Sequence, residues 1–265
     1  EDQLNEKSAY PLKLLFCNDC KLVQTDSVIN PDIMFREYRY LSSIGLSKHF
    51  TELAKILDTR YDIKNKKILE IGCNDGVLLK PLKELGADVY GVDPATNVIK
   101  LARDKGLNVV NDYFSYEKVK DDEYKNQYDL VLANNTFAHI IDIQSVVKGI
   151  KHILKKDGHF IFEVHYLKNL IEDNQWDNIY HEHIYYYSIS ALKNMFERYG
   201  MTVINFEQIP IHSGSIRVTV INNKVKVPSK VLNRIGLETV KLCNIHCFEN
   251  YNKVVNEHIS NFKNQ

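Results

Sequence analysis

From Lys66 onward, short apolar runs alternate with stretches of helical periodicity, and this alternation limits the fold more than any other feature of the chain. Helical spacing is found near 77–85, 97–104 and 143–154, between apolar runs at 67–71, 88–92, 108–110, 128–133 and 159–164. Such alternation predicts βαβ units and a parallel sheet. The last two runs, 202–209 and 215–222, are close enough to pair as an antiparallel hairpin. We therefore expect an α/β, Rossmann-like fold with a seven-stranded, mostly parallel sheet that ends in this hairpin.

The 265 residues suit one large domain with appendages, because single cores tend to split beyond roughly 250–300 residues. We expect a small N-terminal appendage at 1–43, the α/β core at 44–225 and a C-terminal segment at 226–265. The C-terminal segment has the apolar spacing of one long helix, and a further helix is expected over 47–57.

The charge balance argues against nucleic acid as a partner. Lys plus Arg and Asp plus Glu both number 34, so the chain has no overall field that would attract a polyanion. No apolar run approaches the ~20 residues of a membrane-spanning helix. The five cysteines do not indicate a disulfide framework. The composition thus predicts a cytoplasmic protein without nucleic-acid or membrane partners, and it leaves the oligomeric state open.

The first apolar run ends in a turn that contains two glycines. Glu70 lies in the run, Gly72 ends it, and Asn74 and Gly76 follow before the next helix. Glycine allows the backbone to approach a ligand closely, and ligands of doubly wound sheets bind at the carboxyl ends of the strands. The spacing lacks the third glycine of the dinucleotide fingerprint. It is instead similar to the E-x-G-x-x-x-G signature of S-adenosylmethionine (SAM) methyltransferases.

Further positions at strand ends strengthen the prediction of a SAM site. Asp93 ends the second run, where a carboxylate accepts hydrogen bonds from ribose hydroxyls; alternatively, it only caps the helix that follows. Pro94 comes next, Phe114 follows the third run where adenine usually packs, and Asn134 ends the fourth run. Together with the glycine turn, these positions predict a class I SAM methyltransferase core.

The segment after the fifth run is unusually rich in histidine, tyrosine and carboxylate. His183 is a candidate general base, because an imidazole pKa normally lies near neutrality. Glu182 and Tyr180 are candidates to orient it or to bind substrate hydroxyls, and His139 follows a strand end that faces the same pocket. A purely structural polar cluster explains the residues about equally well. A zinc helix is disfavoured, because H-E-H lacks the H-E-x-x-H spacing.

These motifs resemble the sugar C-methyltransferases of deoxysugar biosynthesis, which methylate C-3′ of nucleotide-linked keto sugars. The resemblance runs in order through residues 10–12, 17–24, 35–43, 70–76, 133–139, 179–183 and 212–218. It implies that His183 removes a proton beside the ketone while Tyr180, Glu182 and His139 support it and stabilise the enolate. It implies Tyr38 and Tyr40 in the sugar pocket, and it places further substrate contacts at His181, His212, Ser213 and Arg217.

The chain departs from this family at three places. At one of them His212-Ser213-Gly214 replaces the family's usual H-G-G. Family members carry a zinc knuckle with two C-x-x-C pairs, whereas this chain has only Cys17 and Cys20, and structural zinc takes four ligands. The family also continues into a further domain that helps to hold the nucleotide. We therefore expect SAM, an incomplete zinc site and a nucleotide sugar as acceptor. Two alternatives are an O- or N-methyltransferase acting on a sugar or another small polar molecule, and a SAM-fold protein that has lost catalysis.

Overall fold

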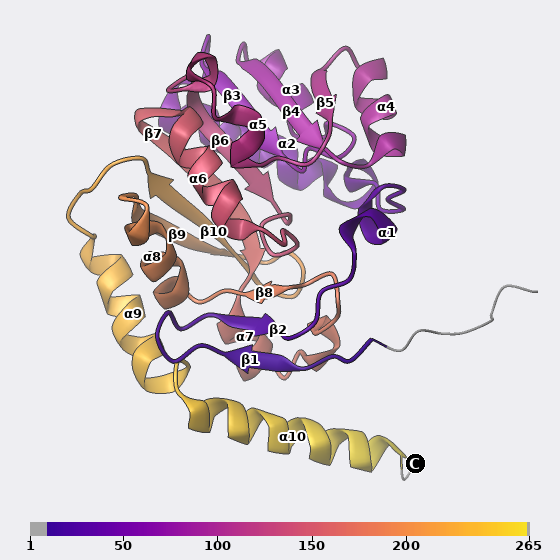
Figure 1. Ribbon diagram of the computed structural model, residues 1–265, viewed down its shortest axis with the longest axis vertical. Helices are drawn as coiled ribbons and strands as arrows, with labels where there is room; N and C mark the ends of the chain where they lie inside the picture. Colours follow the sequence, from indigo (N-terminus) through magenta and orange to yellow (C-terminus); the bar gives the residue numbers. More distant parts are fainter. Residues whose placement is uncertain (1–9, 264–265) are drawn as a thin grey trace, which may run out of the picture.

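The structure is a computed structural model that describes residues 10–263, and its centre is a seven-stranded sheet (Figure 1). The strand order is β5-β4-β3-β6-β7-β10-β9, and the first five strands are parallel. β10 runs antiparallel to both β7 and β9. The bounds are β3 Lys67–Ile71, β4 Asp88–Asp93, β5 Asn108–Asn111, β6 Tyr128–Asn134, β7 Leu154–His165, β9 Thr202–Ile209 and β10 Ser215–Ile221. The predicted sheet and its antiparallel final hairpin are confirmed.

Helices cover both faces of this sheet, because each face presents a continuous apolar surface. One buried cluster joins α2 (Ser42–Tyr61), α3 (Leu79–Glu84) and α4 (Thr96–Asp104) to the sheet. The cluster on the opposite face includes α6 (Ile143–Ile153) and α8 (Ile189–Arg198). Two short helices, α5 (Tyr116–Val119) and η1 (Asp122–Tyr124), lie between β5 and β6.

A second, three-stranded sheet lies beside the core and includes the histidine-rich segment. Its order is β1 (Leu14–Phe16), β2 (Val23–Thr25) and β8 (Tyr185–Tyr186), with antiparallel pairing throughout. α7 (Leu167–Glu172) and α10 (Ile245–Lys263) lie beside it (Figure 1), and η2 (Trp176–Asn178) comes between α7 and β8 in the chain. The rings of Phe16 and Phe248 meet at 4.8 Å between centroids, which places α10 against β1.

The expectation of one long C-terminal helix was wrong. The segment forms α9 (Ser229–Lys241) and α10, which are separated at residues 242–244. Leu242 and Cys243 turn inward at the break and are 4% and 5% exposed. The Asn244 side chain then accepts a hydrogen bond from the Cys247 amide at 3.0 Å, as the cap of a new helix does. Burial of two apolar residues and a new cap thus favour two helices over one.

No helix within residues 10–263 is both long and apolar enough to cross a bilayer. The first nine residues of the expected N-terminal appendage and the last two residues of the C-terminal segment lie outside the described residues.

Candidate active site

A cavity of about 520 Å³ opens at the carboxyl ends of β3, β4 and β6. One part of its wall comes from the loops predicted to bind SAM, and another from the histidine-rich segment. Of the predicted positions, twelve line it: Tyr38, Tyr40, Gly72, Asn74, Asp93, Pro94, Phe114, Asn134, His139, Tyr180, His183 and His212. The structure therefore brings most candidate cofactor and acceptor residues to one enclosed space.

The two glycines of the turn have different roles. Gly72 lines the cavity with a positive φ of 72°, and an added Cβ would lie 2.1 Å from the Thr136 hydroxyl oxygen. Gly76 also has a positive φ, but it is absent from the cavity wall, and its added Cβ would collide with Leu107 at 2.2 Å. Gly76 was expected to approach the cofactor, whereas here it allows the turn to pack against the start of β5.

Asp93 joins two backbone segments of the cofactor end. Its carboxylate accepts hydrogen bonds from the amides of Asn74 and Ala95, both at 2.9 Å. Burial raises the pKa of this carboxyl, and the two amide donors oppose that shift. Each oxygen keeps lone pairs for a ribose hydroxyl. The local turn that Asp93 makes with Ala95 is therefore compatible with a ligand contact.

Glu70 lies behind the cavity wall and is completely buried. Its Oε1 accepts a hydrogen bond from the Asn134 side-chain nitrogen at 3.1 Å, whereas its Oε2 and the Asn134 Oδ1 are buried without a partner in the described chain. Burial raises the pKa of Glu70 to about 8, so the carboxyl is mostly protonated at neutral pH. The Gly72 backbone, which has no room for a side chain, and the Asp93 carboxylate both line the cavity, and together they fit SAM.

Tyr180 and His183 face one another because a tight turn joins them. The His183 amide donates to the Tyr180 carbonyl at 3.0 Å, so residues 180 and 183 lie on one side of the turn. The imidazole Nδ1 lies 3.0 Å from the Asn178 carbonyl. A carbonyl only accepts, so Nδ1 carries the hydrogen and Nε2 accepts from the Tyr180 hydroxyl, also at 3.0 Å.

The two histidines predicted to act in catalysis are electrically neutral at physiological pH. Burial, with nearby histidines, lowers the pKa of His183 to about 4 and that of His139 to about 3. The expectation of a pKa near neutrality at His183 was wrong, because the ring loses its hydration. Burial raises the pKa of Tyr180 to about 12, with Glu182 as a second cause. Glu182 itself lies 4.0 Å from His139 Nδ1, rather than beside His183.

Two neighbours of these residues lie outside the cavity wall. His181 occupies a corner of the same turn, is half-buried, and contacts the Pro11 carbonyl through Nε2 at 3.2 Å. Ser213 uses its carbonyl to accept from Gln175 at 2.7 Å. Both were expected among the substrate contacts, but the turn geometry points His181 away from the cavity.

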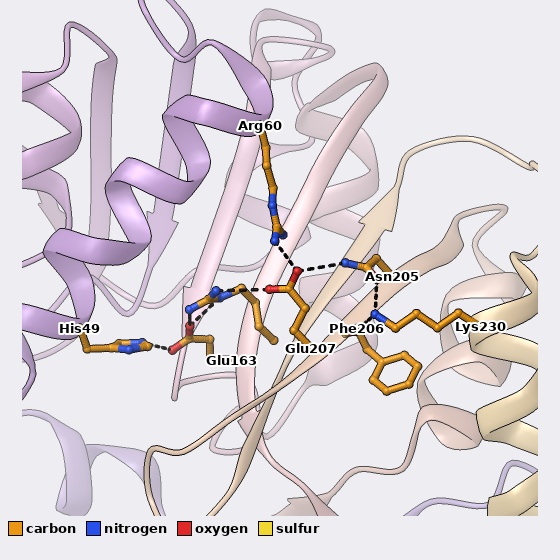
Figure 2. A network of polar contacts seen from close by, with 8 residues as sticks. His49, Arg60, Glu163, Asn205, Phe206, Glu207 and Lys230 are labelled. Atoms are coloured by element: carbon orange, nitrogen blue, oxygen red, sulfur yellow. Dashed lines mark hydrogen bonds and ion pairs between the residues drawn. The ribbon is translucent and has the colours of Figure 1, made fainter.

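Arg217 is absent from the cavity wall and belongs to a polar network, of which Figure 2 labels His49, Arg60, Glu163 and Glu207. Its Nε lies 2.8 Å from Glu163 Oε1, and its Nη1 lies 3.5 Å from Glu207 Oε2. His49 contacts the other Glu163 oxygen at 2.8 Å, and Arg60 pairs with Glu207. This network fastens α2 to the strands β7, β9 and β10. The structure therefore does not bring Arg217 to the cavity with the other predicted substrate residues, because its guanidinium is paired with carboxylates.

His165, at the end of β7, is a cavity residue that the sequence analysis did not identify. Its Nε2 lies 2.8 Å from the Gln175 side-chain oxygen, which makes Nε2 the hydrogen-bearing nitrogen. Its Nδ1 is then a buried acceptor without a partner in the described chain. The ring centroid lies 6.4 Å from that of His183. The only available signal was its position at a strand end.

The two cysteines of the N-terminal appendage do not form a complete metal site. Cys17 and Cys20 lie in the β1–β2 turn, where the Cys20 amide donates to the Cys17 sulfur at 3.4 Å. Within residues 10–263, no cluster of three or more histidine, cysteine or carboxylate side chains could hold a metal ion. The described residues therefore do not fit a four-ligand zinc site.

Comparison with known families identifies the core. A methyltransferase domain model matches residues 36–205, which is well over half of the chain. The chain belongs to the SAM-dependent methyltransferase family. A zinc binding domain model matches residues 1–35. The chain is 34% identical to C-methyltransferase NovU of Streptomyces niveus over 82% of its own length and 53% of the relative's. It is 33% identical to a ubiquinone biosynthesis O-methyltransferase of Photorhabdus laumondii over 40% of its length and 46% of the relative's.

The chain thus spans about half the length of these curated relatives. Two solved structures share the fold. PH0226 protein from Pyrococcus horikoshii superposes with a TM-score of 0.55 at 16% identity, over 69% of this chain and 97% of the other. Magnesium protoporphyrin IX methyltransferase from Synechocystis, solved with bound SAH, superposes with a TM-score of 0.50 at 15% identity. The match covers 67% of this chain and 83% of the other.

Proposed function

We propose that this methyltransferase transfers the methyl group of SAM to a carbon of a nucleotide-linked keto sugar, with His183 as the general base. The observation that carries the proposal is the Tyr180–His183 pair in the wall of the cavity that also contains the candidate cofactor loops. The resemblance of 82% of the chain to C-methyltransferase NovU supports carbon as the acceptor atom.

The pair supplies the two functions that methylation beside a ketone requires. A carbon becomes nucleophilic when a base removes its proton and a donor stabilises the developing enolate oxygen. In the free protein the Tyr180 hydroxyl donates to His183 Nε2. We expect the acceptor's carbonyl to take over that hydroxyl, which frees the Nε2 lone pair for the carbon-bound proton. The C–H electron pair then moves into the enolate, and the proton stays on His183.

Other residues hold the two ligands in place. In this proposal Asp93 accepts hydrogen bonds from the ribose hydroxyls of SAM, and Phe114, which also lines the cavity, packs against the adenine. SAM, when bound, supplies an electrophilic methyl group. The neutral His139 ring lies 5.1 Å from His183 between centroids. There it can donate a further hydrogen bond to the enolate oxygen without the repulsion that a second imidazolium would exert on protonated His183.

The acceptor can be identified by mass spectrometry of full-chain protein incubated with SAM and matched nucleotide sugars, each with and without a ketone. If the methyl group is transferred to carbon, only the keto sugars should gain one methyl. The carbon beside the ketone should also exchange its hydrogen for deuterium from the solvent. Methylation of sugars that carry only hydroxyls would contradict the proposal and favour the O-methyltransferase alternative. Absence of transfer to both sets would contradict a sugar acceptor.

Replacement of the proposed base has a matched control in the same turn. His183→Asn should lower turnover at least ~100-fold, the usual contribution of a positioned base, with SAH affinity retained. His181→Asn should leave turnover unchanged, because the half-buried His181 lies outside the cavity wall. Activity of the unmodified protein should fall only as the pH falls toward about 4, where His183 becomes protonated. An acidic limb near pH 6.5, or near-normal turnover of His183→Asn, would mean that another group is the base.

A further inference from the structure

Residues 36–41, here called the strap, cross the cavity between α1 (Pro31–Phe35) and α2. In Figure 1 the chain leaves β2, passes through α1 and enters α2 on the side of the molecule that carries α4. Tyr38 and Tyr40 line the cavity from the strap, and Phe35 does so from the end of α1. Nothing between residues 30 and 41 is fully buried. Apolar packing therefore contributes little to holding this segment in place.

Two asparagine side chains hold the strap through its backbone. Asn97 Oδ1 accepts from the Tyr38 amide at 3.1 Å, and Asn97 Nδ2 donates to the Tyr38 carbonyl at 2.7 Å. Asn74 repeats the pattern, because its Nδ2 donates to the Tyr40 carbonyl at 3.0 Å and its Oδ1 accepts from the Ser42 amide at 3.2 Å. Each carboxamide acts like one peptide group of a neighbouring strand.

Asn97 differs from Asn74 in its location. Asn74 lies in the cofactor turn and lines the cavity, whereas Asn97 is exposed in the first turn of α4 and outside the cavity wall. The Asn97 side chain is therefore free of direct ligand contact. Its pair of hydrogen bonds fixes the backbone of Tyr38, whose side chain lines the cavity.

Tyr38 connects those regions. Its ring lies 5.9 Å from that of Phe35, which in turn lies 5.9 Å from His139. Burial raises the pKa of Tyr38, and the further causes include Glu182, Tyr180 and Asp93, so the phenol lies within electrostatic range of both the catalytic segment and the cofactor end. Displacement of the strap would remove this ring from the acceptor site.

We propose that Asn97 is a positioning residue that latches the strap across the cavity and so places Tyr38 and Phe35 against the acceptor. This inference rests on the proposed function for the identity of the acceptor, whereas the latch itself can be tested without one. No bond to the acceptor or to SAM is assigned to Asn97.

The direct test is amide hydrogen exchange in the SAH-bound protein, with no acceptor present. Asn97→Ala should speed exchange of the Tyr38 amide by about tenfold, the effect of losing hydrogen bonds of ordinary strength. The Ser42 amide, which Asn74 holds, should change little and serves as an internal control. Lys100→Ala is the matched variant, because Lys100 is exposed on the same helix. Equal Tyr38 exchange in Asn97→Ala and Lys100→Ala would overturn the latch.

Kinetics separate positioning from general structural damage. Asn97→Ala should lower kcat/KM for the acceptor about tenfold, in line with the same loss of hydrogen bonds, while SAH affinity and the melting temperature stay close to those of Lys100→Ala. Asn97→Asp, which keeps an acceptor for the Tyr38 amide but repels its carbonyl, should give intermediate exchange and activity. An equal loss of SAH affinity would assign Asn97 to the cofactor site and contradict the proposal. If the unmodified protein methylates no sugar, the proposed function fails while the exchange result still decides the latch.

Discussion

The buried carboxyl of Glu70 leads to a quantitative prediction about stability. Its pKa rises from 4.5 to about 8 in the folded protein, mainly because burial removes its hydration. An unfolded chain ionises this group near its ordinary pKa. The folded state therefore binds the extra proton throughout the range between these two values, and the free energy of unfolding falls as the pH rises through that range.

Glu70→Gln removes this cost, because the amide has no proton to lose. At pH 7 the cost corresponds to about 2.5 pKa units, or roughly 3 kcal/mol at 1.36 kcal/mol per unit. The carboxamide oxygen of the variant can still accept from Asn134, and its NH₂ group takes the place of the unpartnered Oε2. We expect the variant to be about 2–3 kcal/mol more stable than the unmodified protein at pH 7, and almost equally stable near pH 4.5.

Urea unfolding at several pH values between 4.5 and 8.5 measures this difference. Glu84→Gln is the matched control, because that side chain is 64% exposed in α3. The control keeps Glu70, so its stability should fall with pH in parallel with that of the unmodified protein. A stability gain of Glu70→Gln that is the same at pH 5 and pH 8 would refute the reasoning, since it would mean that Glu70 titrates alike in both states.

Two further predictions concern the cofactor site and the buried network. Asp93→Ala should weaken SAH binding, measured by calorimetry, about 100-fold, because two hydrogen bonds to a charged group are worth roughly 1.5–3 kcal/mol each and are rarely additive; unchanged affinity would remove the ribose role. Arg217→Ala should cost about 3–5 kcal/mol of unfolding free energy, because it leaves the fully buried Glu163 carboxylate without its guanidinium. Arg217→Met combined with Glu163→Gln should recover most of that loss, and failure to recover would mean that packing, not charge, explains the effect.

The sheet could be predicted from the sequence because its signals are local. Each parallel strand appears as a short apolar run, and the length of the intervening helices leaves few ways to connect them. The three-stranded sheet was less predictable. Tyr185–Tyr186 pairs with Val23–Gln24 across more than 150 residues of chain, and nothing in either segment identifies the other. The break at 242–244 was missed for a related reason, since it depends on burial against distant elements.

Candidate site residues could be predicted where the position in the chain alone determines whether a residue lines the cavity. They were harder to predict where the direction of the side chain determines it. Gly72, Asp93 and Asn134 end strands, so the edge of the sheet places them at the cavity. Arg217 follows Ser215 by two positions and lies on the same face of β10, yet only Ser215 lines the cavity. The carboxylates opposite Arg217 come from β7 and β9, and a sequence without known strand register does not reveal them.

The basicity of the proposed catalytic histidine is a property of the whole cavity and of no single position. His139, His165, His183 and His212 all line the cavity, and burial lowers the pKa of each. Each ring also disfavours the charge on its neighbours, so the protein keeps a set of neutral imidazoles. A neutral imidazole can accept a proton from the acceptor carbon at any physiological pH. Because its pKa is low, the protonated ring readily returns that proton to the enolate. We infer that the chain relies on trapping the enolate by methyl transfer, and less on the strength of its base.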